Sequence, residues 1–133
     1  MTASGSIYGI NGPIIYLKGD DGFQMNEMVY VGQNNLVGEV IGLTSERTTI
    51  QVYEETTGLK PGEPVTGTGA PVSVTLAPGI ITNIFDGIER PLSAIKESSG
   101  CYIDRGVHVS PLNISKKWPA HLIVQPGQYV YPG

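Results

Sequence analysis

The fold prediction starts from one stretch, Ile50-Gln51-Val52-Tyr53-Glu54-Glu55-Thr56-Thr57-Gly58-Leu59-Lys60-Pro61-Gly62-Glu63-Pro64-Val65. Its first residues continue an alternation that begins at Thr48, and side chains two apart on a strand share one face. In the loop, Pro61 stands where a type II turn fixes φ, and Gly62 where that turn needs a positive φ. We therefore predict a strand over residues 48–53 with Ile50 and Val52 facing the core, a sharp turn, and a returning strand from Val65.

The flanking sequence repeats this pattern of short strands and tight turns. Further strands are predicted over residues 7–10, 14–17, 28–31, 36–43 and 71–76. The turn signals between them are Asn11-Gly12-Pro13, Gly32-Gln33-Asn34-Asn35 and Thr44-Ser45-Glu46-Arg47. The 18 Gly and 10 Pro interrupt long helices but suit short strands. Because there is no room for crossover helices, we predict a small closed barrel, which would leave no free sheet edge.

The character of the sequence changes at Ala77. Apolar residues then fall at helix-like spacings until Gly87 and Pro91 end the pattern; they are Ile80, Ile81, Ile84, Phe85 and Ile88. Residues 96–100 are predicted to be a polar link, followed by strands over 102–109 and 121–124. The predicted fold class is therefore mainly β: a closed N-terminal barrel in residues 1–76, a short helical segment in 77–95, and a small, incomplete β-rich appendage in 96–133.

Composition excludes several classes of function. A length of 133 residues suits one domain, or a small domain with an appendage. The formal net charge of -4 gives no basic footprint for nucleic acid. Cys101 is the single cysteine, which agrees with a reducing compartment. The first residues lack a signal peptide pattern, and no apolar run is long enough to span a membrane. We expect a cytoplasmic protein that does not insert into the membrane by itself.

Two groups of charged residues could suggest chemistry. Asp86, Glu89 and Arg90 could share one helical surface as a carboxylate pair with a guanidinium. We favour an ion pair in a solvated turn, because no partner base or metal ligand is evident. Glu54 and Glu55 could suggest a cation site, but neighbours on a strand point to opposite faces. We favour solvation or a subunit contact for both of them.

The remaining candidates also favour structural interpretations. His108, His121 and Cys101 cannot supply a recognisable zinc cluster, and Cys101 is interpreted as buried or idle. Residues 62–67 have the glycine spacing of a phosphate loop but lack its lysine. Three aromatic residues could form an exposed patch that binds a partner: Trp118, Tyr129 and Tyr131. We favour the alternative, in which they pack in a small second sheet. We predict no catalytic, cofactor-binding or metal-binding residue in this chain.

Six stretches in order carry a resemblance to a known family. They are Ser6–Pro13, Val37–Ile41, Ile50–Val65, Gly79–Leu92, Arg105–Val109 and Lys116–Trp118. Together they resemble the N-terminal portion of the catalytic A subunit of the V-type and archaeal A-type rotary ATPases. After Trp118 that family usually continues through a longer, glycine-rich β insertion called the bulge, whereas Pro119–Gly133 is brief.

The resemblance implies an assembly role. In this family the first segment is a β-barrel, and barrels from alternating A and B subunits form a crown that holds the hexamer together. The implied partners of this chain are the non-catalytic B subunit barrels and other A subunits, with the peripheral stalk meeting residues 96–133. The implied location is cytoplasmic, peripheral to the membrane, as part of an ATPase complex.

The resemblance also implies where the chemistry lies. ATP and Mg in this family are held through a Walker A loop, Gly-x-x-x-x-Gly-Lys-Ser/Thr. This sequence has no Gly-Lys pair. The cofactors are therefore expected elsewhere in the parent protein and none in this fragment, which should have no ATPase activity of its own. The alternative is a stand-alone protein-binding domain derived from the same barrel. A small enzyme using Asp86, Glu89 and a histidine is least favoured.

Overall fold

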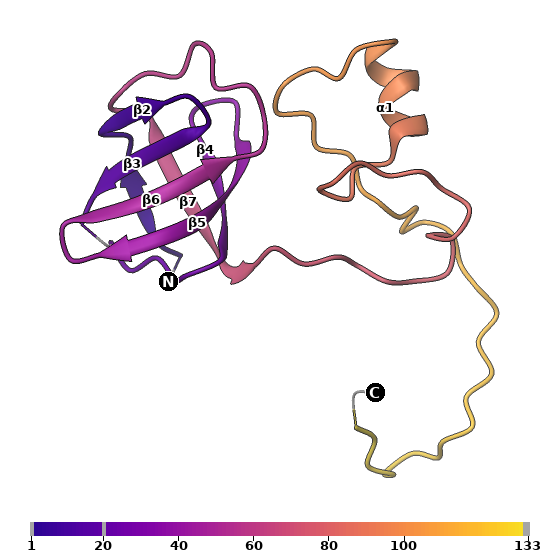
Figure 1. Ribbon diagram of the computed structural model, residues 1–133. Coiled ribbons are helices and arrows are strands. Elements are labelled where there is room, and N and C mark those ends of the chain that lie inside the picture. The colour runs from indigo at the N-terminus through magenta and orange to yellow at the C-terminus, as the bar shows by residue number, and fades with distance from the viewer. Residues whose placement is uncertain (1, 20, 132–133) are drawn as a thin grey trace.

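The computed structural model describes residues 2–19 and 21–131, which form a barrel followed by a largely irregular chain with one helix (Figure 1). The strands are β1 (Ser4–Ser6), β2 (Gly9–Asn11), β3 (Ile14–Lys18), β4 (Glu27–Val31), β5 (Leu36–Thr44), β6 (Arg47–Val52) and β7 (Pro64–Pro71). The helix is α1 (Leu92–Ser99).

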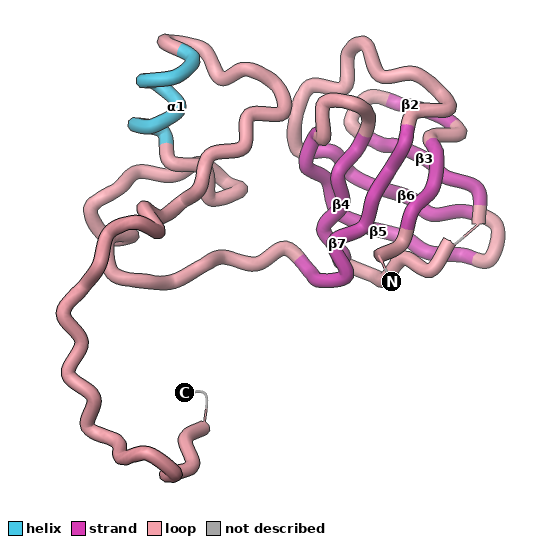
Figure 2. Tube along the Cα trace, turned by 180° about the vertical axis from the view of Figure 1, so that it is seen from behind, coloured by secondary structure: helices cyan, strands magenta, loops and turns pink. Residues whose placement is uncertain are grey.

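The sheet closes on itself through the N-terminal segment. Its antiparallel order is β1-β7-β4-β5-β6-β3-β2, so the two outermost strands are consecutive in the chain. Between them, the Ile7 amide donates to the Glu63 carbonyl at 2.9 Å, while the Tyr8 amide donates to the Tyr16 carbonyl at 2.7 Å. One segment therefore bonds β7 on one side and β3 on the other (Figure 2). This confirms the predicted barrel, in which residues 7 and 8 bridge from β7 to β3.

The core fills the inside of the barrel, as the alternation predicts. Ile50 lies opposite Ile15 on β3 and Val40 on β5, and all three are fully buried. Val52 is also buried, which confirms that residues 50 and 52 face inward. The core cluster consists of Ile7, Ile15, Leu17, Phe23, Val29, Val31, Leu36, Val40, Ile50, Val52 and Val65. Apolar burial of this kind is the main favourable contribution to folding.

The predicted turns are present at the predicted places. β4 and β5 are joined by residues 32–35, with positive φ at Gly32 and Asn35. In the turn that precedes β7, the Glu63 amide donates to the Lys60 carbonyl at 3.2 Å and Gly62 has a φ of 91°. These are the features of the expected type II turn.

A buried carboxylate closes one end of the barrel, which the sequence did not indicate. Glu27 is 2% exposed, and its carboxylate accepts the Gln24 amide at 2.8 Å and the Gly69 amide at 2.7 Å. A register shift between β4 and β7 lies at this point. A Cβ on Gly67 would lie 2.2 Å from Glu27 Oε1, so the strand needs a glycine there.

The predicted strand over residues 71–76 is wrong. β7 ends at Pro71, and the alternating residues beyond it, Val72, Val74 and Leu76, are exposed. The physical reason is closure: β7 already pairs with β1 and β4, so residues 72–76 have no neighbouring strand. An alternating pattern forms a strand only where a partner is available.

The helix lies after the segment where it was predicted. Residues 80–88 form turns, and α1 begins at Leu92, immediately after Pro91, which occupies the cap position. The Asp86 carboxylate accepts the amides of Ile88 and Arg90, and Glu89 has a positive φ, which together fold 86–90 into a tight turn. Residues 96–99, predicted as a polar link, belong to the helix instead.

The predicted second group of strands is also wrong. Residues 100–131 contain no strand, and Tyr102 and Leu122 are largely exposed. The residues adopt turns and extended irregular chain, which first returns to the barrel after α1 and then runs away from it (Figure 1). Because an isolated extended segment has no ladder to satisfy its backbone groups, strand-like composition alone does not make a sheet. The division at residues 76 and 95 stays a prediction.

Candidate functional site

Two regions bring together the residues that the sequence analysis singled out: the outer wall of the barrel, and the junction between the barrel and the chain that follows it. We call residues 72–111 the arm. The chain leaves the barrel after β7, and the segment after α1 returns to it (Figures 1 and 2). The junction is the contact between this arm and the barrel.

The outer wall carries aromatic residues held by charged ones. The Tyr53 hydroxyl donates to the Glu39 carboxylate. That hydrogen bond, with smaller contributions from burial and from the Glu39 charge, raises the pKa of Tyr53 to about 12. On the neighbouring strands, the Arg47 guanidinium lies 4.9 Å from the centre of the Tyr16 ring, a cation–π geometry. Glu39 and Arg47 therefore occupy the outside of the barrel.

Glu54 is the centre of the junction. Its side chain is only 6% exposed, and it lies just beyond the end of β6. The carboxylate accepts the Val37 amide at 3.3 Å, the Arg90 Nη1 at 3.3 Å and the Gly106 amide at 2.9 Å. One carboxylate therefore joins the barrel to two separate parts of the arm.

Arg90 is held in turn by Asp86. The Arg90 Nε donates to Asp86 Oδ2 at 2.7 Å, and the backbone amides of Arg90 and Ile88 donate to Oδ1 at 2.9 and 3.1 Å. Burial acts to raise the pKa of Asp86, but the hydrogen bonds from Arg90 and Ile88 and the Arg90 charge outweigh it. The pKa therefore lies below its usual value. The guanidinium is 14% exposed and bridges two carboxylates.

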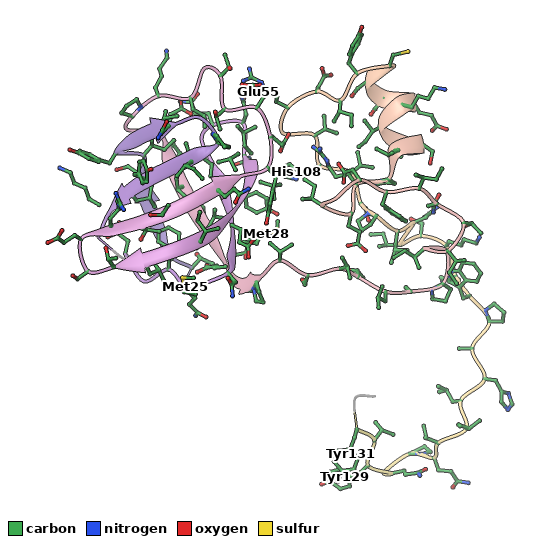
Figure 3. All side chains as sticks on the ribbon, viewed as in Figure 1. Met25, Met28, Glu55, His108, Tyr129 and Tyr131 are labelled. Carbon is green, nitrogen blue, oxygen red and sulfur yellow. The ribbon has the colours of Figure 1, made fainter. Side chains whose placement is uncertain are left out.

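A second set of contacts lies beside the first. Arg105 Nη1 donates to the Thr57 carbonyl. The His108 Nε2 lies 3.0 Å from the Asn35 carbonyl, and its ring meets Tyr30 edge-on with centroids 5.3 Å apart. Figure 3 shows His108 between the barrel and the arm. These contacts are mostly polar, so the arm is held to the barrel chiefly by hydrogen bonds and charge.

The junction also forms a half-open pocket of about 440 Å³. Its barrel side is formed by Met28, Tyr30 and Val37, and its arm side includes Ile88 and Val109. Val37 is 5% exposed although it lies outside the core cluster. The arm therefore covers part of the outer face of β4 and β5.

The junction brings together some, but not all, of the charged residues that the sequence analysis singled out. The interpretation of Asp86 and Arg90 as an ion pair in a turn is confirmed. Glu89 points elsewhere, and its carboxylate accepts the Thr75 amide at 3.0 Å. Glu55 is exposed and bonds Thr57, whereas the side chain of Glu54 is only 6% exposed, so solvation is wrong for Glu54. A subunit contact stays a prediction for both residues. Position 54 lies beyond the end of β6, so the period of two assigns its side chain no face, and no signal in the sequence separates it from Glu55.

The glycine-spaced segment 62–67 is a turn followed by a strand. Gly67 lies within β7, and the Glu63 carboxylate accepts the Lys60 amide at 2.9 Å and the Gln33 amide at 3.2 Å. The amides of Gly62 and Gly67 donate to the carbonyls of Ile7 and Ala3, whereas a phosphate loop leaves such donors free for the ligand.

The other candidates lie apart from one another. Cys101 is exposed, so the buried interpretation is wrong. Across the described residues, no three His, Cys, Asp or Glu side chains gather as a metal site would require. The Trp118 ring lies beside Gly79 and under Lys116, whose Nζ is 4.2 Å from the ring centre. We call residues 112–131 the tail. Tyr129 and Tyr131 are exposed at its far end (Figure 3), so packing in a second sheet is wrong for these aromatic residues.

Comparison with known proteins identifies the barrel. Residues 7–69 match the model of the ATP synthase alpha/beta family, beta-barrel domain. The barrel of this chain belongs to the ATP synthase alpha/beta family. The match covers β2 to β6 and most of β7, the strands that enclose the core. Within residues 2–19 and 21–131, no helix is both long and apolar enough to cross a membrane.

Similarity to this family continues beyond the barrel. The chain is 51% identical over 133 residues to the V-type ATP synthase alpha chain of Halothermothrix orenii. It is 49% identical over 132 residues to the A subunit of the A-type ATP synthase of Methanopyrus kandleri. These alignments cover 100% and 99% of this chain, but 22% of each relative. With the corresponding A subunit of Pyrococcus horikoshii it is 50% identical over 118 residues, which cover 89% of this chain and 12% of that relative. The chain thus spans about a fifth of the length of the first relatives.

Proposed function

We propose that this chain is the N-terminal assembly region of the catalytic A subunit of a V/A-type ATP synthase, and that its barrel holds the A/B hexamer together. The observation that carries the proposal is the identity of about half of all residues with A and alpha subunits over the full chain, through the arm as well as the barrel. The crown partners are the barrels of the non-catalytic B subunits. The parent is an ion-translocating rotary enzyme, peripheral to the membrane on its cytoplasmic side.

The barrel has the physical properties that such a ring requires. Its end strands β1 and β2 are joined by one N-terminal segment that bonds both β7 and β3, so the sheet curls into a barrel whose outer wall offers side chains to a neighbour. Contact through side chains makes partner choice depend on charge and shape. Glu39 and Arg47, with the tyrosines they hold, are residues on the outer wall that can make such contacts.

The nucleotide chemistry belongs to other parts of the parent protein in this proposal. In the glycine-spaced segment 62–67, the amides of Gly62 and Gly67 already donate to backbone carbonyls, those of Ile7 and Ala3, which supports a structural role. ATP and Mg are then cofactors of the parent and not of this region. The exposed apolar residues between 112 and 131 support a contact role for the tail, with the peripheral stalk as its partner.

The test is association with a purified non-catalytic B subunit. Charge reversal by Glu39→Lys or Arg47→Glu should weaken binding at least about tenfold, because like charges then meet at the contact. The melting temperature of each variant should stay close to that of the wild type. Lys117→Glu, in the exposed tail, is the matched control and should bind normally. Unchanged affinity in both barrel variants would contradict the crown role.

A further inference from the structure

We propose that Glu54, Arg90 and Asp86 form a latch that holds the arm on the barrel, and that opening this latch releases the arm while the barrel stays folded. The structure holds the closed state, in which Glu54 accepts hydrogen bonds from Arg90 and Gly106. The inference concerns contacts within one chain and does not depend on ring assembly.

The arm has little core of its own to hold it in place. Within residues 72–111, only Pro91 and Ile95 are buried. Large apolar side chains elsewhere in the arm face solvent, with Ile81 94% exposed and Ile84 73% exposed. Regions with few buried apolar contacts open at low free-energy cost, well below global unfolding. What fixes the arm must therefore come from its contacts with the barrel.

Two of those contacts, from Arg90 and from Gly106, converge on one charged group. The Glu54 carboxylate joins three backbone segments, because its donors come from β5, from the 86–90 turn and from the loop after α1. Its partner Arg90 is also held in position by Asp86, whose carboxylate accepts a hydrogen bond from the Arg90 Nε. Removing the Glu54 charge takes the shared acceptor from the Gly106 amide and from Arg90, which then keeps only its pair with Asp86. Neutralising Glu54 should therefore affect both arm contacts together.

The barrel does not depend on the latch. Its core cluster and its closing hydrogen bonds lie among residues 7–65, and Glu54 is not part of them. Only the bond from the Val37 amide belongs to the barrel itself. Loss of Glu54 should leave the strands paired, which makes the two parts separable by experiment.

Gly106 offers an independent way to open the same latch. Its φ is 69°, and a Cβ placed on it would lie 2.1 Å from the Asn34 carbonyl oxygen of the barrel. That oxygen belongs to the backbone of the tight turn between β4 and β5, so it cannot move aside easily. Gly106→Ala should therefore push the loop off the barrel without changing any charge.

The experiment is amide hydrogen exchange on the whole chain. Glu54→Gln keeps the size of the side chain, but it removes the charge that pairs with Arg90 and replaces one of the two acceptor oxygens with a donor. We expect the amides of Gly106 and Arg90 to exchange at least about tenfold faster in this variant, and likewise in Gly106→Ala. Barrel amides, such as Val52 and Tyr8, should exchange as in the wild type.

The matched control is Glu55→Gln, which changes the same side chain one residue away, where it is exposed and bonds only Thr57. It should leave the exchange of the arm unchanged. If Glu54→Gln and Glu55→Gln give the same arm exchange, there is no latch. If both opening variants accelerate barrel amides as strongly as arm amides, arm and barrel unfold together and the inference is wrong.

Discussion

Truncating Ile50 to alanine tests the barrel core directly. Ile50 is fully buried between β3 and β5, opposite Ile15 and Val40. The change removes three carbons, and at about 0.8 kcal/mol for each buried methylene the lost transfer free energy is about 2.4 kcal/mol. The strands on both sides are held by paired backbones, so the cavity cannot collapse fully. We expect a total loss of about 4 kcal/mol, within the usual range of about 2–5 for such changes.

The matched control is Ile41→Ala, on the neighbouring strand β5. Ile41 is 42% exposed and lies where the register of β5 against β6 shifts. Its truncation should cost less than about 1 kcal/mol. Urea unfolding followed by circular dichroism measures both losses. Tryptophan fluorescence would not report unfolding of the barrel, because Trp118, the one tryptophan, lies in the tail. Similar losses for the two variants would refute the assigned faces of β5 and β6.

Two predictions concern pH. In a spectrophotometric titration, Tyr53 should ionise near pH 12. Glu39→Gln should move this pKa back toward the ordinary value of 10.0. If the pKa of Tyr53 does not change in the variant, the hydrogen bond to Glu39 is not its cause. Asp86 has a lowered pKa in the folded chain, so its contribution to holding the 86–90 turn is complete above the unfolded value of 3.8 and is lost as the pH falls through the lower folded value. The amide resonances of Ile88 and Arg90 should report that midpoint, Asp86→Asn should abolish it, and a midpoint above 3.8 would contradict the predicted sign.

The strands could be predicted where local chemistry decides them. Ile50 and Val52 follow a period of two, and Pro61-Gly62 matches the dihedral angles of one turn type. Those predictions are confirmed because strand faces and tight turns depend on near neighbours. The same reasoning failed at residues 71–76, whose alternation is equally regular. Whether a segment joins a sheet depends on a free partner strand, and closure by the N-terminal segment had removed it.

The helix shows a second limit of local reasoning. The apolar spacing between Ile80 and Ile88 suits a helix, but the Asp86 carboxylate captures two nearby amides and folds a turn. Side chains of this type compete with the backbone for hydrogen bonds, and periodicity does not register that competition. The helix then begins after Pro91, where φ is already suitable.

By itself, the sequence determined the barrel class, most of its strands, its turns and the resemblance to the A subunits of rotary ATPases, because these depend on periodicity, turn chemistry and ordered motifs. Only the tertiary structure decided which acidic residue matters. Glu54 and Glu55 are identical neighbours in the sequence, yet one bonds Gly106, 52 residues away, and the other faces solvent. The reason is that burial and hydrogen-bond partners are set by how distant segments meet, and no local pattern of residues encodes that meeting.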